Sequence, residues 1–279
     1  MRNRRRAQQR VAYIVSCEHG GNDIPTPYAA LFRGRARLLA SHRGYDPGAL
    51  LTARDLARAL HATLVVARVS RLLVELNRSP GRQFRFSPIM RNAPRDVRDD
   101  VCRRHYLPYR DKVEAFVAHA IASGVRVVHV SSHSFTPLLD GIVRHGDVGL
   151  LYDPARIRER DLCVRWQRAL AALRPDWIVR RNYPYLGKSD GFTSYLRKRY
   201  DAASYLGVEL EVNQKHVRGG DVPAGERASI VAALRQALAP QARVNRVSGA
   251  RRRTRASATM RASPPARRSG ASYRCESRD

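Results

Sequence analysis

Short apolar runs rich in β-branched residues alternate with segments of helical periodicity along most of the chain, and this alternation restricts the possible folds most strongly. Runs of about four to eight apolar residues are typical of buried strands, while apolar residues three and four positions apart indicate helices. Strands alternating with helices predict an α/β fold with a largely parallel sheet, in which functional side chains gather at the carboxyl ends of the strands. We expect strands over residues 11–17, 63–69, 125–131, 147–152, 177–180 and 205–213, helices over 47–62, 96–123 with a break near Pro108, 158–173, 191–200 and 225–238, and a loop over 80–95.

The distribution of charge separates the two ends of the chain from its middle. Of the formal net charge of +28, residues 1–10 contribute +5 and residues 241–279 contribute +9, which leaves +14 for residues 11–240. The last segment consists largely of Arg, Ser, Ala and Pro without an apolar period, a composition typical of disorder. We therefore predict a disordered basic arm over 1–10, one folded domain over 11–240 and a disordered Arg-rich tail over 241–279.

Composition also argues against several classes of protein. No apolar run approaches the ~20 residues of a membrane span, and the four cysteines are too widely spaced for a disulfide framework or a CxxC metal site. The run at 11–17 follows an Arg-rich start but has no small-residue cleavage site, so we expect a cytoplasmic protein without a membrane partner. Nearly all basic residues are arginine, and alanine is abundant, a combination typical of a GC-rich coding bias. The charge is therefore weak evidence for nucleic-acid binding, and we expect only non-specific contacts through the tail.

Two histidines follow predicted strands directly and are candidates for one metal site. His19 lies two residues beyond the strand at 11–17, and His133 follows the strand at 125–131. A catalytic Zn²⁺ commonly takes two histidines and a carboxylate and keeps one position for water. By contrast, His129 lies inside its predicted strand, which favours a core position.

The third ligand has several candidates. Asp46 lies just before a predicted helix, where a carboxylate is also a common N-cap. Glu18 and Asn22 are alternatives close to His19.

Glu209 and Glu211 are two apart in a predicted strand and therefore point to the same face. Acids in an apolar strand are costly to bury unless they are paired or functional. Beside a metal, such a carboxylate can take a proton from water and pass it to a leaving amine. The alternative is an edge strand with a solvated acidic face.

Arg71, Asn77 and Arg78 follow the predicted strand at 63–69. Arginine binds carboxylates through two parallel hydrogen bonds, and asparagine can add a third. The segment 182–191, which ends in a glycine, is either a lid or a simple connection.

Six segments in this order resemble the N-formylglutamate amidohydrolase family. They are EHGGNDIP at 18–25, GYDPGA at 44–49, SRLLVELNRSP at 70–80, HSFTP at 133–137, NYPYLGKSDGFT at 182–193 and ELEVNQ at 209–214. The resemblance covers about residues 11–240. It implies a single-domain three-layer sandwich around a mostly parallel mixed sheet, similar to the zinc carboxypeptidases and aspartoacylases.

The resemblance also implies roles for individual residues. His19 and His133 match metal-ligand positions, and Asn77 and Arg78, with Arg71 as a possible helper, match a pair that binds the substrate carboxylate. Glu211 best matches the general base, with Glu209 as the alternate. The related metallopeptidases have His-x-x-Glu at their first ligand motif. Here Asn22 takes the place of that Glu, so we choose Asp46 as the third ligand.

These observations predict a metal-dependent hydrolase that uses Zn²⁺ or another divalent metal to cleave the amide bond of a small N-acyl amino acid. The substrate that the resemblance implies is N-formyl-L-glutamate, which would yield formate and L-glutamate. Two alternatives remain: a nucleic-acid-binding protein that uses its Arg-rich ends, and a metal-free hydrolase fold that serves as a binding module.

Overall fold

The computed structural model describes residues 9–81 and 85–240. The described residues up to Pro240 belong to one compact unit. Most of the predicted basic arm and the whole predicted tail lie outside the described residues, so those boundaries stay predictions. No helix in the described part of the chain is long and apolar enough to cross a bilayer.

A six-stranded mixed sheet forms the middle of the domain, in the order β2-β1-β3-β8-β6-β7. Neighbouring strands run parallel except for β6 and β8, which are antiparallel. This arrangement confirms the predicted mostly parallel mixed sheet. The strands are β1 Val11–Cys17, β2 Thr63–Val66, β3 Arg126–Phe135, β6 Val148–Leu151, β7 Val179–Arg181 and β8 Tyr205–Asn213.

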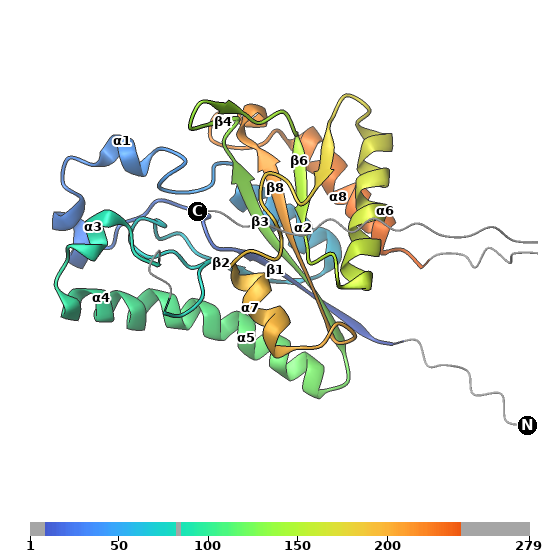
Figure 1. The fold of residues 1–279 in the computed structure, drawn as a ribbon, viewed down its shortest axis with the longest axis horizontal. Coiled ribbons are helices and arrows are strands. Elements are labelled where there is room, and N and C mark those ends of the chain that lie inside the picture. Colours follow the sequence, from blue (N-terminus) through green and yellow to red (C-terminus); the bar gives the residue numbers. More distant parts are fainter. Residues whose placement is uncertain (1–8, 82–84, 241–279) are drawn as a thin grey trace, which may run out of the picture. The chain divides into compact units, whose positions relative to one another are not determined.

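Helices cover both faces of the sheet and make the predicted three layers (Figure 1). One apolar core joins the sheet to α2, α6 and α8, and a second joins the other face to α5 and α7. These helices are α2 Ala49–Leu60, α5 Leu107–Ala122, α6 Ile157–Leu173, α7 Phe192–Arg199 and α8 Ala224–Leu238. Shorter elements are the 3₁₀ helices η1 Thr26–Phe32 and η4 Gln214–His216, the helices α1 Ala36–Leu39, α3 Pro88–Arg91 and α4 Arg95–Val101, and the hairpin of β4 Leu138–Leu139 and β5 Ile142–Val143.

The local structure differs from the prediction at three places. The helix expected over 96–123 is interrupted by a π-helical turn, Cys102–Tyr106, ahead of Pro108. Pro108 follows this turn as the second residue of α5, and as a proline it has no backbone N–H to donate to the preceding turn. The loop expected over 80–95 contains α3, and the β4–β5 hairpin was not predicted.

The strand expected to end at Ser131 continues to Phe135, because this polar stretch pairs with β8 along its whole length. His133 therefore lies inside β3 and not beyond its end. β8 is flanked by β3 and β6, so the alternative of an edge strand with a solvated acidic face is wrong.

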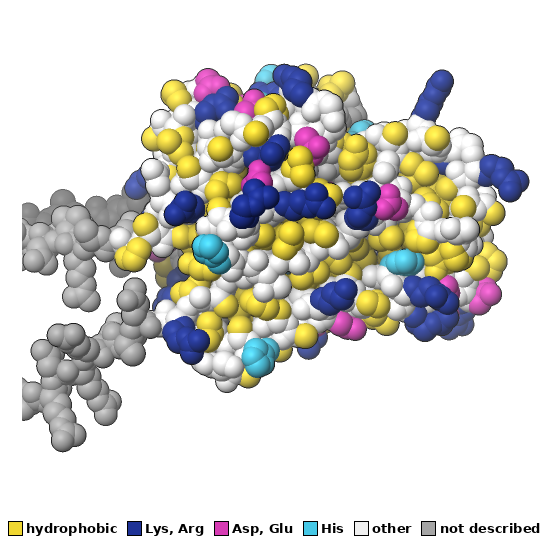
Figure 2. Space-filling view, turned by 180° about the vertical axis from the view of Figure 1, so that it is seen from behind, with side chains coloured by type: hydrophobic (Ala, Val, Ile, Leu, Met, Phe, Trp, Pro, Cys, Tyr) yellow, Lys and Arg dark blue, Asp and Glu magenta, His cyan; other side chains and the backbone are white. Residues whose placement is uncertain are grey.

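Basic side chains are exposed on the surface of the domain. Figure 2 shows a row of Lys and Arg across the middle of one face, with acidic and apolar side chains around it. Part of the net positive charge of residues 11–240 is therefore carried on this face.

Candidate metal and catalytic site

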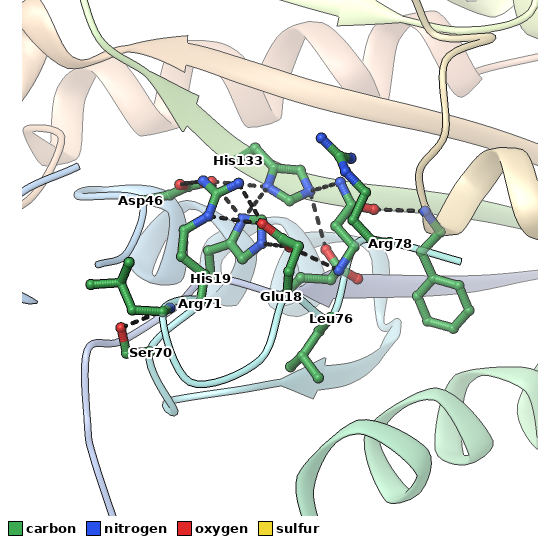
Figure 3. A network of polar contacts seen from close by, with 12 residues as sticks. Glu18, His19, Asp46, Ser70, Arg71, Leu76, Arg78 and His133 are labelled. Carbon is green, nitrogen blue, oxygen red and sulfur yellow. Dashed lines mark hydrogen bonds and ion pairs between the residues drawn. The ribbon is translucent and has the colours of Figure 1, made fainter. Parts of the chain in front are cut away.

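Three buried side chains converge at the carboxyl edge of the sheet. His19 follows β1, Asp46 precedes α2, and His133 lies on β3, and all three are at most 4% exposed. The Nδ1 atoms of the two histidines are 3.2 Å apart. Asp46 Oδ2 lies 3.1 Å from Nδ1 of His19 and 2.9 Å from Nδ1 of His133. Figure 3 shows this cluster, which we call the His–Asp–His cluster.

The cluster fits a divalent cation. Its three facing atoms form a triangle with sides of 2.9–3.2 Å. The ligands of a tetrahedral Zn²⁺, bound at about 2.0–2.2 Å, are separated by about 3.3 Å, and imidazole nitrogen and carboxylate oxygen are preferred zinc donors.

The second ring nitrogen of each histidine, Nε2, contacts a buried glutamate. Nε2 of His19 forms a hydrogen bond with Oε1 of Glu75. Nε2 of His133 lies 3.2 Å from Oε2 of Glu18, which also accepts a hydrogen bond of 2.6 Å from Ser131 Oγ. Such contacts fix the tautomer and orientation of metal-binding histidines, so Nδ1 of each ring is directed to the shared centre.

Arg71 joins two of the acids in this network. Its Nη1 donates to Asp46 Oδ1 at 3.0 Å, and its Nε and Nη2 donate to Glu75 Oε2 at 2.9 and 2.6 Å. Three of its donors are thus used within the protein (Figure 3). The sequence analysis assigned Glu75 no role. Its position between the apolar residues Val74 and Leu76 was the available signal, and the structure shows all three residues to be buried.

The charges of the network favour a cation at its centre. Burial alone would raise the pKa of Asp46, but His19 and Arg71 hold the pKa of this carboxyl well below its usual value. Burial opposes a charged His133, yet the hydrogen bonds to Asp46 and Glu18 raise the pKa of its ring well above the usual value. The same anionic surroundings would stabilise a metal ion.

The geometry does not support an N-cap role for Asp46, nor does it place Asn22 or Glu18 as the third ligand. The N-cap of α2 is Gly48, and no side chain caps that helix, so the N-cap alternative for Asp46 is wrong. Asn22 Nδ2 donates to the carbonyl oxygen of Leu39 at 3.1 Å. Glu18 binds the far nitrogen of His133 and not the centre of the cluster.

Glu209 and Glu211 face the same pocket but differ in their surroundings. Glu209 Oε1 accepts a hydrogen bond of 2.5 Å from Thr193 Oγ1. Glu211 Oε2 is buried and has no hydrogen-bond partner among the described residues. Burial, with the nearby charges of Asp46 and Glu209, raises the pKa of Glu211 to about 8. Glu211 is therefore the acid whose oxygen is free to exchange a proton in the pocket.

Asn77 and Arg78 lie on the loop after β2. Asn77 Oδ1 accepts a hydrogen bond of 2.6 Å from the backbone N–H of Phe192, at the start of α7. Arg78 Nη1 donates to the carbonyl oxygen of Asp190 at 2.7 Å. Both residues line the pocket over the His–Asp–His cluster.

One pocket of about 440 Å³ is lined by the eight residues to which the sequence analysis assigned a metal-binding, catalytic or substrate-binding role. Its lining includes His19, Asp46, Arg71, Asn77, Arg78, His133, Glu209 and Glu211. His129 is fully buried, with its ring nitrogens 2.7 Å from Ser16 Oγ and 2.8 Å from Tyr205 Oη, as expected for a core histidine.

The segment 182–191 forms a fixed wall of this pocket. Asn182 Oδ1 accepts hydrogen bonds from the N–H groups of Tyr152 and Gly187, at 3.0 and 3.1 Å. A Cβ at Gly187 would lie 2.1 Å from the backbone nitrogen of Tyr152, so only glycine permits this close packing. These contacts favour a connection over a lid.

Comparison with known proteins gives a family match and several similar structures. The sequence profile of the N-formylglutamate amidohydrolase family (FGase) matches residues 11–217, a range that contains all eight pocket residues named above. The gene product Atu2144 from Agrobacterium tumefaciens has 31% identity and a TM-score of 0.67, with 83% of this chain and 91% of that chain covered. The N-formylglutamate amidohydrolase from Ralstonia eutropha JMP134 has 17% identity and a TM-score of 0.57, with 83% and 94% covered, which shows a shared fold. No curated protein matches the chain.

Proposed function

The chain belongs to the N-formylglutamate amidohydrolase family, and we propose that it is a metal-dependent enzyme that hydrolyses the amide bond of an N-acyl amino acid. The family points to N-formyl-L-glutamate as the first substrate to test. The observation that carries the proposal is the His–Asp–His cluster, which lies in one pocket with Glu211, whose buried Oε2 has no hydrogen-bond partner among the described residues.

In this proposal His19, Asp46 and His133 hold one divalent metal ion, with Zn²⁺ the ion that best suits their donor atoms. When bound, such an ion makes a water molecule more acidic and polarises a carbonyl oxygen. Glu75, Glu18 and Arg71 then act as positioning residues, since they bind the outer atoms of the three ligands.

Glu211 is the proposed general base. Its buried oxygen accepts a proton from the attacking water and returns it to the nitrogen of the leaving amino acid. Glu209, tied to Thr193, supports the site and remains the alternate base. Because Nε, Nη1 and Nη2 of Arg71 already donate to carboxylates of the protein, we assign the substrate carboxylate to Arg78, with Asn77 beside it.

The proposal is tested by a panel of N-acyl amino acids incubated with zinc-loaded protein, with the released amino acid and acyl acid measured. We expect hydrolysis by the wild type and its loss in the His133→Ala variant, while alanine at the exposed His145 has no effect. Binding of the panel without hydrolysis, by a protein that purifies without metal, would favour the metal-free binding module. The nucleic-acid alternative depends on the Arg-rich ends and stays a prediction, which salt-dependent DNA binding before and after deletion of 241–279 can test.

A further inference from the structure

Arg110 on α5 is a buried cation that has no part in the proposed reaction so far. Its side chain is only 2% exposed. Removing a guanidinium from water is unfavourable unless hydrogen bonds and other groups compensate its charge. The carboxylate of Glu114 lies 3.9 Å from Nε of Arg110, which is beyond hydrogen-bond distance. The groups that do bind this guanidinium therefore indicate what Arg110 does.

The guanidinium of Arg110 holds the backbone of the loop that carries Asn77 and Arg78. Its Nη1 donates to the carbonyl oxygens of Leu76 and Arg78 at 3.2 and 3.3 Å. The hydroxyl of Tyr106, in the π-helical turn before α5, donates to the same carbonyl oxygen of Arg78 at 2.6 Å. Backbone groups on both sides of Asn77 are thus tied to Arg110, and this restricts the directions in which the side chains of the loop can point.

The same guanidinium packs against the first turn of α7. Its central carbon lies 3.9 Å from the centre of the Phe192 ring and 4.4 Å from that of Tyr195. A guanidinium over the face of an aromatic ring is attracted to it electrostatically. The backbone N–H of Phe192 in turn donates to Asn77 Oδ1 at 2.6 Å. Arg110 therefore contacts both of the segments that this hydrogen bond joins.

We propose that Arg110 is a positioning residue for substrate binding. It holds the loop of residues 76–78 against the first turn of α7, so that Arg78 and Asn77 present their side chains to the substrate carboxylate. Arg110 acts through these two residues, since it lies outside the pocket lining. This inference rests on the proposed amide hydrolysis and extends its substrate-binding side to a third layer of residues behind the pocket.

The variant Arg110→Met tests this role, because methionine keeps an apolar contact with the rings but has no N–H groups to donate. We expect KM of the zinc-loaded protein for N-formyl-L-glutamate to rise by about 10- to 100-fold, with a smaller change in kcat and with one zinc ion still bound per chain. A binding group displaced by about 1 Å can cost as much as ~100-fold. Lys112→Met, on the exposed side of the same helix, is the control and should leave KM unchanged. A KM equal to that of the wild type, or a loss confined to kcat, would overturn the inference.

A substrate without carboxylates separates positioning of Arg78 from a general loss of structure. The diamide of N-formyl-L-glutamate replaces both carboxylates by uncharged carboxamides of similar size. The wild type should prefer the acid, and Arg110→Met should reduce this preference in kcat/KM by about tenfold, because a displaced Arg78 no longer distinguishes the two compounds. An equal loss for acid and diamide would show a merely structural role and overturn the inference.

Tyr106→Phe provides a second and milder variant, which keeps the ring and removes one hydrogen bond to the carbonyl oxygen of Arg78. It should shift the same preference in the same direction by a smaller factor, and it decides the question if Arg110→Met does not fold. A preference equal to that of the wild type would then contradict the inference.

Hydrogen exchange tests the inference without a substrate, in case the wild type does not hydrolyse N-formyl-L-glutamate and the proposed function fails for this compound. The amide of Phe192 reports on the loop, because its acceptor is Asn77 Oδ1. We expect this amide to exchange at least about tenfold faster in Arg110→Met than in the wild type, while the amides of β3 remain equally protected. Equal exchange at Phe192 in both proteins would overturn the inference, whatever the substrate.

Discussion

His133 on β3 and Glu211 on β8 are paired in register on neighbouring parallel strands, and both side chains line the same pocket. The sheet itself thus sets the spacing between a proposed metal ligand and the proposed base. Backbone hydrogen bonds on both sides of β8 fix this pair, since β8 lies between β3 and β6.

Asp46→Asn should weaken zinc binding by more than the roughly 10- to 100-fold that is typical of changes beyond the ligands themselves. The variant removes the negative charge that lies between the two histidines, whereas Asn22→Ala should leave the zinc affinity close to that of the wild type. Competition with a chelator measures both. The reverse ranking would move the third ligand to Asn22 or its neighbours.

Glu75→Gln should lower zinc affinity by roughly 10- to 100-fold while the protein still folds. The amide can keep one acceptor for the N–H of His19, but it cannot neutralise Arg71, which donates to Glu75 through Nε and Nη2. The same chelator competition measures the change, with Glu114→Gln on α5, outside the pocket lining, as the control. An unchanged affinity would show that His19 is oriented by other contacts.

Arg78→Lys should raise KM for an N-acyl amino acid by about tenfold or more, with a smaller change in kcat. Lysine keeps the charge but loses the planar pair of donors that matches a carboxylate. Steady-state kinetics give the two constants, and Arg58→Lys on the exposed face of α2 serves as the control, since its side chain is 79% exposed. A KM equal to that of the wild type would rule out this role for Arg78.

Metal-free protein should lose stability as the pH rises from about 5 to 8, and Glu211→Gln should remove part of that loss. Burial raises the pKa of Glu211 to about 8 in the folded protein, above its usual value of 4.5, so the protonated form is favoured by folding. The contribution of Glu211 to the free energy of unfolding is fully present below the pKa that this residue has in the unfolded chain. It declines by up to about 1.4 kcal/mol per pH unit until the pH reaches the pKa of the folded protein. Denaturant unfolding at pH 5 and pH 8 in the presence of a chelator measures the difference. If the free energy of unfolding changed with pH to the same extent in the wild type and the variant, the raised pKa of Glu211 would be contradicted.

Local sequence patterns were sufficient for most of the fold. The strands at 11–17 and 205–213 have the bounds that were predicted. The first is a compact apolar run, and in the second apolar residues alternate with Glu209 and Glu211. The end of β3 was missed, since the polar run from Ser131 to Ser134 has no strand signal of its own and is held by pairing with β8.

Site residues could be proposed from the sequence where a strand end or a family motif marked them. The contacts among them could not, because they join distant positions. Glu75 meets His19 across 56 positions of sequence, and Glu18 meets His133 across 115. Likewise, nothing in the order of residues indicates that Arg71 bonds to two acids of the protein.

A zinc titration of metal-stripped protein, followed by both calorimetry and amide hydrolysis, tests the proposed metal-dependent reaction most directly. We expect one zinc ion per chain, a rate that rises in proportion to bound zinc, and a Glu211→Gln variant that binds zinc equally but is slower by roughly 10²–10⁴-fold. A metal-stripped protein that retains the full rate, or a Glu211→Gln variant that hydrolyses as fast as the wild type, would contradict it.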